Sequence, residues 1–142
     1  MGSASIEIPL IDIERDSNGR YLPCNEVLLI GRVSSIAQSR ELPSGDVVVE
    51  VRLVVERGKK GSRSGKKREV DTLDLAIWKA RLQKRALKVE VDEWIYVEGA
   101  VRRRFWQAPH GLASRWQVEV DELTVLPAQT IKEQTPRALK RP

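Results

Sequence analysis

The amino-acid sequence predicts an all-β fold, a Greek-key barrel of five strands with one short helix between the third and fourth strands. Two observations lead to this prediction. Apolar and polar residues alternate with a period of two along most of residues 25–126, which is typical of half-buried strands. One segment within that range has helical periodicity instead. A chain of 142 residues has room for one hydrophobic core.

The first two predicted strands lie on either side of a turn signal. The first covers residues 27–33, and a loop follows it. The sequence Pro-Ser-Gly-Asp at 43–46 favours a turn before the second strand, residues 47–55. Every odd position of that strand is Val or Leu, whereas Glu50 and Arg52 are at even positions. One face should therefore contact the core and the other should contact solvent.

The third strand, about residues 70–78, and the fourth, which starts near residue 94, flank the helical segment 79–89. In that segment Leu82, Ala86 and Val89 recur at helical spacing among basic residues. We expect these residues of the two strands to point inward: Leu73, Leu75, Ile77, Ile95, Val97, Gly99 and Val101.

The fifth predicted strand covers residues 116–126, after a Pro-His-Gly turn at 109–111. Its inward parity changes between Val120 and Leu123, which indicates a β-bulge. Three strands, a helix and two strands are the element order of the OB-fold, a barrel that binds oligonucleotides with its strands and loops.

The composition changes at both ends of this region. We interpret residues 1–24 as a weakly ordered leader with a turn at Asn18-Gly19, residues 25–126 as the OB-fold domain, and residues 127–142 as a disordered basic tail. No secretory signal is visible at the start of the sequence, so we expect a cytoplasmic protein.

The positive charge is concentrated in one segment. The net charge is +5, but residues 57–68 (RGKKGSRSGKKR) hold seven basic residues and no acidic one. Its glycines indicate a flexible hairpin loop, which either contacts phosphates or is only a solvated tip. The candidate phosphate-binding residues in it are Arg57, Lys59, Lys60, Arg63, Lys66, Lys67 and Arg68.

The parity of the strands places two tryptophans on the outside of the barrel. Trp78 follows the inward-facing Ile77, and Trp106 shares its outward face with Arg102 and Arg104. A nucleobase stacked on such a ring contributes about 1–3 kcal/mol whatever the base. Alternatively, the rings fill a subunit interface or cover the end of the barrel. We assign Trp94 and Trp116 the same outward parity but, because each lies at a strand start, expect them to pack.

The sequence argues against catalysis and against a resident cofactor. His110 is the only histidine and has no nucleophile beside it, and Cys24 has no Cys or His neighbour for a metal site. Asp71 and Asp74 differ in parity and cannot share a metal or a proton. No phosphate-binding glycine loop occurs, and no apolar run is long enough to span a membrane. We expect no enzyme, no metal site and no membrane protein.

Four motifs in residues 25–126 resemble the bacterial single-stranded DNA-binding protein (SSB) family. NEVLLIGRV is similar to its first strand, and RELPSGDVVVEVRLVVER to its R-x-x-P-S-G turn and second strand. DLAIWK is similar to the end of its third strand. WIYVEGAVRRRFW is similar to its fourth strand, with V-x-V-E-G and R-x-R-x-W. Four motifs in order with compatible spacing are specific, although each alone is modest.

This resemblance implies a homotetramer of OB barrels that wraps single-stranded DNA in replication, repair and recombination, in the cytoplasm at the nucleoid. It places Trp78 and Trp106 at positions where rings stack on bases. Arg40, Arg102 and Arg104 fall where basic residues contact phosphates, and residues 57–68 correspond to the family's long second hairpin.

The chain departs from the family pattern in three places. Lys59 and Leu73 stand where the family has more aromatic residues, and the helix is more basic. The chain ends in TPRALKRP, without the acidic tip that recruits partner enzymes. This pattern suits a paralogue that coats DNA without those partners, or one with a specialised role.

Two other functions remain compatible with the same residues. Stacking and phosphate contacts do not read the 2′-hydroxyl, so the domain could bind RNA. The exposed rings would also suit a protein–protein adaptor.

Overall fold

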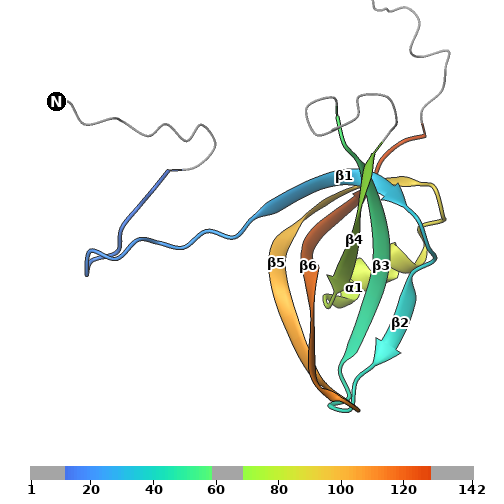
Figure 1. Ribbon diagram of the computed structural model, residues 1–142. Helices are drawn as coiled ribbons and strands as arrows, with labels where there is room; N and C mark the ends of the chain where they lie inside the picture. The colour runs from blue at the N-terminus through green and yellow to red at the C-terminus, as the bar shows by residue number, and fades with distance from the viewer. Residues whose placement is uncertain (1–11, 59–68, 129–142) are drawn as a thin grey trace, which may run out of the picture.

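The computed structural model describes residues 12–58 and 69–128 and contains six strands and one helix (Figure 1). The elements are β1 (Val27–Val33), β2 (Gln38–Glu41), β3 (Val47–Glu56), β4 (Val70–Ile77), α1 (Ala80–Leu87), β5 (Trp94–Ala108) and β6 (Gly111–Val125).

The strands form a closed barrel, as the sequence predicts. Their order is β1-β5-β6-β4-β3-β2, and a further pairing of β1 with β3 closes the sheet on itself. This closing contact pairs Arg32 with Val54 and Val33 with Leu53. β4 and β6 are parallel, and the other pairs are antiparallel. Five strands therefore make the barrel, and β2 is added at the edge of β3.

The strand β2 is absent from the sequence prediction, which treats this segment as part of a loop. Its four residues, Gln-Ser-Arg-Glu, are all exposed, so they carry no apolar alternation. The strand exists because its backbone pairs with β3, from Gln38↔Glu50 to Glu41↔Val47. The helix has the predicted place in the chain, but it lies between the fourth and fifth of six strands.

The core consists of the inward-facing residues of the barrel together with one face of the helix. The turn at 43–46 is present and Gly45 has a φ of +94°, a conformation that favours glycine. The buried residues that form the core include Val49, Val51, Leu53, Leu75, Ile77, Leu82, Ala86, Val89, Ile95, Val97, Val118, Val120 and Leu123.

Three polar residues of α1, namely Arg81, Gln83 and Arg85, attach the helix to the barrel. The Gln83 side-chain amide donates to the carbonyl oxygens of Val47 and Ile77, both at 2.9 Å. Arg85 donates to the carbonyl oxygen of Leu123, and Arg81 pairs with Glu122 at 2.7 Å. Several polar residues of this helix thus have structural partners at the end of the barrel.

The predicted bulge in the last strand is confirmed. The register of β5 and β6 passes from Glu98↔Glu122 to Gly99↔Val120, so Asp121 is the additional residue. This extra residue is the reason why Val120 and Leu123 both point into the core although their numbers differ in parity.

β5 and β6 continue beyond the barrel as a two-stranded extension, which we call the β5–β6 arm (residues 101–117). The pairing with β1 ends at Gly99 and the pairing with β4 begins at Val118, whereas β5 and β6 remain paired to Ala108↔Gly111. Figure 1 shows the two strands running together to the lower end of the molecule.

The arm corrects two predictions. Val101 has inward parity but is 38% exposed, because it lies past the rim of the barrel. The sequence predicts that Trp116 points outward and packs at a strand start. It lies within β6 on the face of the inward-pointing Val118, and it is 60% exposed. Parity assigns a face, but only the length of the neighbouring strands decides whether that face is covered.

The segment before the barrel contains the predicted turn at Asn18-Gly19. The Asp16 carboxylate accepts hydrogen bonds from the backbone N–H groups of Asn18 and Arg20, and Gly19 has a φ of +83°. Arg15 and Tyr21 form an isolated β-bridge across this turn. Residues 1–11 and most of the predicted tail lie outside the described residues, so the weak order predicted for the leader and the disorder predicted for the tail remain predictions.

Of the described glycines, Gly99 has the least room for a side chain. A Cβ at this position would lie 2.1 Å from the Glu119 carbonyl oxygen, which cannot move without disturbing β6. We expect Gly99→Ala to lower the free energy of unfolding by about 2 kcal/mol or more, as measured by urea denaturation. Gly58→Ala is the control, since its Cβ meets nothing within 4 Å. Equal stability of the two variants would contradict this account of the barrel.

Candidate nucleic-acid interface

Charged side chains form a band across the outward face of β2, β3, β4, β6 and β5. The pairing registers place Arg52 beside Asp74, and Arg104 beside Arg115. Because alternate residues of a strand share a face, the others line up with them. We call this set the arginine band: Arg40, Glu50, Arg52, Asp74, Arg102, Arg104, Arg115 and Glu119.

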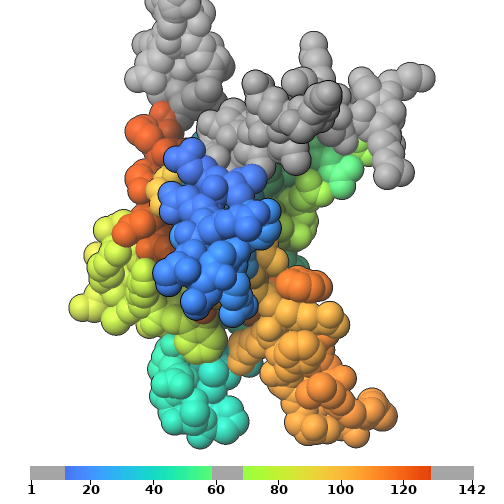
Figure 2. Space-filling view, turned by 90° about the vertical axis from the view of Figure 1, so that its left-hand side faces the viewer, coloured from blue at the N-terminus to red at the C-terminus, as the bar shows by residue number. Residues whose placement is uncertain are grey.

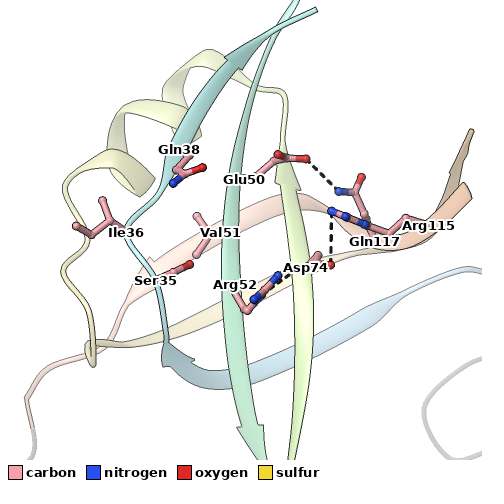
Figure 3. Close-up of a pocket in the computed structure, with 9 residues that line it drawn as sticks. All are labelled: Ser35, Ile36, Gln38, Glu50, Val51, Arg52, Asp74, Arg115 and Gln117. Atoms are coloured by element: carbon pink, nitrogen blue, oxygen red, sulfur yellow. Dashed lines mark hydrogen bonds and ion pairs between the residues drawn. The ribbon is translucent and has the colours of Figure 1, made fainter. Parts of the chain in front are cut away.

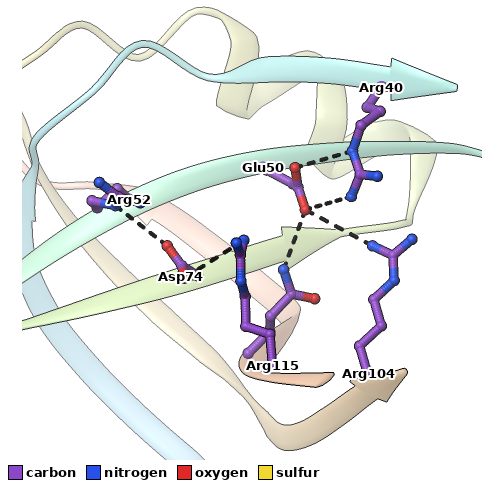
Figure 4. A network of polar contacts seen from close by, with 7 residues as sticks. Arg40, Glu50, Arg52, Asp74, Arg104 and Arg115 are labelled. Carbon is purple, nitrogen blue, oxygen red and sulfur yellow. Dashed lines mark hydrogen bonds and ion pairs between the residues drawn. The ribbon is translucent and has the colours of Figure 1, made fainter. Parts of the chain in front are cut away.

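Glu50 is the centre of the band (Figure 4). Its carboxylate accepts hydrogen bonds from Arg40, at 3.3 Å from Nε and 2.9 Å from Nη2. Gln117, a buried polar residue, donates to the same carboxylate at 3.2 Å. Arg104 completes the arrangement, with Nη1 at 3.8 Å. Three strands and the edge strand β2 therefore meet at one carboxylate.

Two further carboxylates pair with the other arginines of the band. Asp74 lies between Arg52, whose Nε is at 3.3 Å, and Arg115, whose Nη1 is at 3.9 Å (Figures 3 and 4). Glu119 pairs with Arg102 at 3.2 Å. With five arginines and three carboxylates, the band keeps a net positive charge of two.

The environment of Glu50 keeps it ionised. Burial by itself would raise its pKa, but the hydrogen bonds from Arg40 and Gln117, together with the charges of Arg40 and Arg104, outweigh burial and lower the pKa below 4.5. At neutral pH the carboxylate is therefore charged and orients the two arginines.

Trp106 lines a hollow between the turn that joins β2 to β3 and the β5–β6 arm. The hollow has a volume of about 630 Å³, and the ring is 40% exposed. Figure 2 shows a gap between these two elements at the lower edge of the molecule. The lining residues are Arg40, Leu42, Pro43, Glu50, Arg104, Trp106, Gln107, Arg115 and Gln117.

A second hollow continues the first toward β3. It has a volume of about 320 Å³ and shares Glu50, Arg115 and Gln117 with the Trp106 hollow (Figure 3). The two together form a groove that crosses the strands, with arginines on its walls. Such a groove suits an extended polyanion.

Trp78 lies at the other side of Arg104. The half-buried ring lines a shallow hollow of about 180 Å³ with Ala76, Arg102 and Glu119. The Arg104 guanidinium carbon is 5.8 Å from the centroid of the Trp78 ring, and Arg104 also lines the Trp106 hollow. One arginine thus links the two rings.

The structure brings five of the predicted site residues together: Arg40, Trp78, Arg102, Arg104 and Trp106. Arg57 is separate, at the end of β3, where it pairs with Asp71 at 2.7 Å. The hydrogen bond from Arg57 lowers the pKa of Asp71. The remaining predicted residues lie outside the described residues: Lys59, Lys60, Arg63, Lys66, Lys67 and Arg68.

Sequence reasoning overlooked Arg115 and Gln117, which line both hollows of the groove. A signal for them exists. Val118 and Val120 point inward, so continuing the strand backwards from them would have directed Arg115 and Gln117 to the outward face. The prediction began this strand at Trp116 and so excluded Arg115.

Within residues 12–58 and 69–128, no cluster of three or more potential metal ligands occurs. In the same part of the chain, no helix has the length and apolar character needed to cross a membrane.

Residues 24–126 match the Single-strand binding protein family. The match covers more than half of the chain. The chain belongs to the single-strand binding protein family. The motifs noted in strands β1, β3 and β5 all lie within the matched range.

Two solved structures of the single-strand binding family share the fold of this chain. The SSB of Plasmodium falciparum in complex with ssDNA has a TM-score of 0.61 and 19% identity, over 75% of this chain and 97% of that chain. A deletion mutant of the single-stranded DNA binding protein from Thermus aquaticus has a TM-score of 0.61 and 20% identity. That match covers 75% of this chain and 52% of that chain, so this chain spans about half of the Thermus protein.

The pKa of Glu50 generates a prediction about stability. Because the pKa of Glu50 is lower in the folded state than in the unfolded state, the ionised Glu50 carboxylate stabilises the folded protein at neutral pH. That stabilisation is lost as the pH falls through the folded-state pKa. We expect Glu50→Gln to lower the free energy of unfolding by about 0.5–1 kcal/mol at pH 7. The difference from wild type should shrink as the pH is lowered from about 5 toward 3. Urea denaturation at each pH measures the free energy of unfolding of both proteins. A difference between them that does not change with pH would refute the stabilising role of the ionised Glu50.

Proposed function

We propose that this member of the single-strand binding protein family binds single-stranded DNA without sequence preference. The observation that carries the proposal is the half-exposed indole of Trp106 in a groove that Arg40, Arg104 and Arg115 also line. An indole offers its face to any base, and arginines contact the phosphates between bases. Trp78, linked to the groove by Arg104, provides a second ring.

The ion pairs of the arginine band are compatible with phosphate binding. These pairs are partly exposed, and ion pairs at a protein surface contribute little to stability, about 0–1 kcal/mol each. A phosphate can therefore replace a carboxylate as the partner of an arginine at small cost. Before a phosphate binds, the carboxylates keep the guanidinium groups oriented on the groove. The net positive charge of the band nevertheless attracts a polyanion.

We propose that the basic segment 57–68 adds phosphate contacts to those of the groove. Arg57 stands where β3 ends and this segment begins. If about five charges of the segment neutralise phosphates, the logarithm of the binding constant falls with the logarithm of salt with a slope of about −3.5. Raising the salt from about 50 to 200 mM would then weaken binding roughly a hundredfold.

We further propose that the protein self-associates, as a homotetramer by analogy with its family. The outward face of β1 exposes two large apolar side chains, Leu28 and Ile30. In the described part of the chain, residues 27–31 pair with β5 on one side, while the pairing of β1 with β3 is limited to Arg32 and Val33. An apolar face next to an open strand edge favours association.

In this proposal the protein has no catalytic role. It coats single strands at the nucleoid during replication, repair or recombination.

The first test is alanine substitution of the two rings. We expect Trp106→Ala and Trp78→Ala each to weaken binding of a labelled oligo-dT by about 1–3 kcal/mol, roughly 5- to 150-fold, in fluorescence anisotropy at low salt. Trp106→Phe and Trp78→Phe serve as controls that retain a stacking ring. Unchanged affinity together with a changed oligomeric state would support an adaptor, and tighter binding of oligo-U than of oligo-dT would support an RNA-binding domain.

The second test concerns the carboxylate at the centre of the band. We expect Glu50→Gln to tighten oligo-dT binding about three- to tenfold at about 50 mM salt, because Arg40 and Arg104 lose their competing partner. The salt slope should become steeper by about 0.7 for each arginine released to a phosphate. Glu122→Gln is the matched control, since Glu122 pairs with Arg81 of the helix. An affinity and a salt slope both equal to those of wild type in Glu50→Gln would contradict a role of Arg40 and Arg104 in phosphate contact.

A further inference from the structure

The β5–β6 arm carries aromatic rings on both of its faces. Trp106 lies on the face that belongs to the groove. On the opposite face, Phe105 is 54% exposed and Trp116 is 60% exposed. The register pairs Arg103 with Trp116 and Phe105 with Ser114, so these residues are neighbours on that face. We call this set the Arg103 face: Arg103, Phe105, Leu112, Ser114 and Trp116.

Arg103 lies between the two rings. Its guanidinium carbon is 5.3 Å from the centroid of the Phe105 ring and 5.4 Å from that of Trp116. The side chain is held in place by Ser114, whose hydroxyl oxygen accepts from Nε at 3.2 Å and from Nη2 at 2.9 Å. In the described residues, Nη1 makes no hydrogen bond and remains able to donate to a ligand.

The charge of this face differs from that of the groove. The other arginines of the arm, Arg102, Arg104 and Arg115, each pair with a carboxylate. Among the described residues, no carboxylate pairs with Arg103. A cation without a neutralising partner, fixed between two exposed rings, is complementary to a phosphate flanked by bases.

We propose that the Arg103 face is a second binding site for single-stranded nucleic acid, occupied by a further segment of the strand that lies in the groove. This inference rests on the proposed function. Phe105 and Trp116 stack on bases, and Arg103 contacts the phosphate between them.

The shape of the arm makes occupation by one strand possible. Beyond the barrel the arm is only two strands wide, and neighbouring strands lie about 4.8 Å apart. Its tip is the exposed turn at Pro109 and His110. A strand that stacks on Trp106 can therefore pass around the edge or the tip of the arm and reach the Arg103 face without crossing the barrel. The arm is then held between two segments of one ligand.

The test compares oligo-dT of two lengths on the full-length protein, about 6 and about 16 nucleotides, which bracket the site sizes of single OB-folds. We expect Trp116→Ala to weaken binding of the longer strand about tenfold and of the shorter strand less than twofold, whereas Trp106→Ala weakens both. Phe105→Ala is the second variant and should behave like Trp116→Ala. Leu87→Ala is the matched control, because Leu87 is an exposed apolar side chain on α1, outside both the groove and the Arg103 face.

Each result decides between the sites. If Trp116→Ala and Phe105→Ala leave the longer strand bound as in wild type while Trp106→Ala weakens it, the second site is refuted and the proposed function stands. If Trp116→Ala weakens binding of the short and the long oligo-dT equally, the ring belongs to the groove and the second site is refuted. A changed oligomeric state with unchanged affinity would make the Arg103 face a protein contact. If wild type binds neither length, the proposed function itself fails.

A charge reversal gives an independent readout. We expect Arg103→Glu to weaken binding of the longer strand more than Trp116→Ala does, and to make its salt slope shallower by about 0.7. A slope equal to that of wild type would refute the phosphate contact.

Discussion

Adjacent side chains of a strand point to opposite faces of the sheet. In a small closed barrel the inward face is packed with core side chains, so only the outward face can contact a ligand. This constraint determines which residues of the protein can meet a ligand. Closure requires β1 to approach β3 and β5 to cross β6 so closely that Gly31 and Gly99 have no room for a Cβ. Once the sheet is closed in this way, the outward residues of β3, β4, β5 and β6 form one continuous surface, and the arginine band lies on it.

The arginine band combines two requirements that usually conflict. A site for a polyanion needs positive charge, but several arginines close together repel one another. Glu50, Asp74 and Glu119 reduce that repulsion and orient the guanidinium groups while leaving a positive surplus. Because the pairs are partly exposed, they are weak enough to exchange a carboxylate for a phosphate. The groove is therefore organised before a ligand arrives.

The β5–β6 arm follows a different rule from the barrel. Inside the barrel, the inward side of β5 and β6 is buried by β1, β4 and the helix. Beyond the rim, no further strand in the described part of the chain pairs with β5 or β6, so the face that points inward in the barrel is exposed in the arm. Residues that have inward parity but lie beyond the rim, such as Val101 and Trp116, are therefore at the surface. The extension thus converts one side of a core strand into a surface that can contact a ligand.

The sequence by itself determined the five barrel strands, the helix, the bulge near Asp121 and the outward direction of Trp78 and Trp106, because each depends on local periodicity. It did not determine β2, whose four exposed residues have no periodicity and depend on pairing with β3. Nor did it show that Glu50 meets Arg40 and Arg104, or that Trp116 is exposed. Those features depend on which strands are neighbours and on how far each one extends, and only the tertiary structure decides both, because the contacts join residues far apart in the chain.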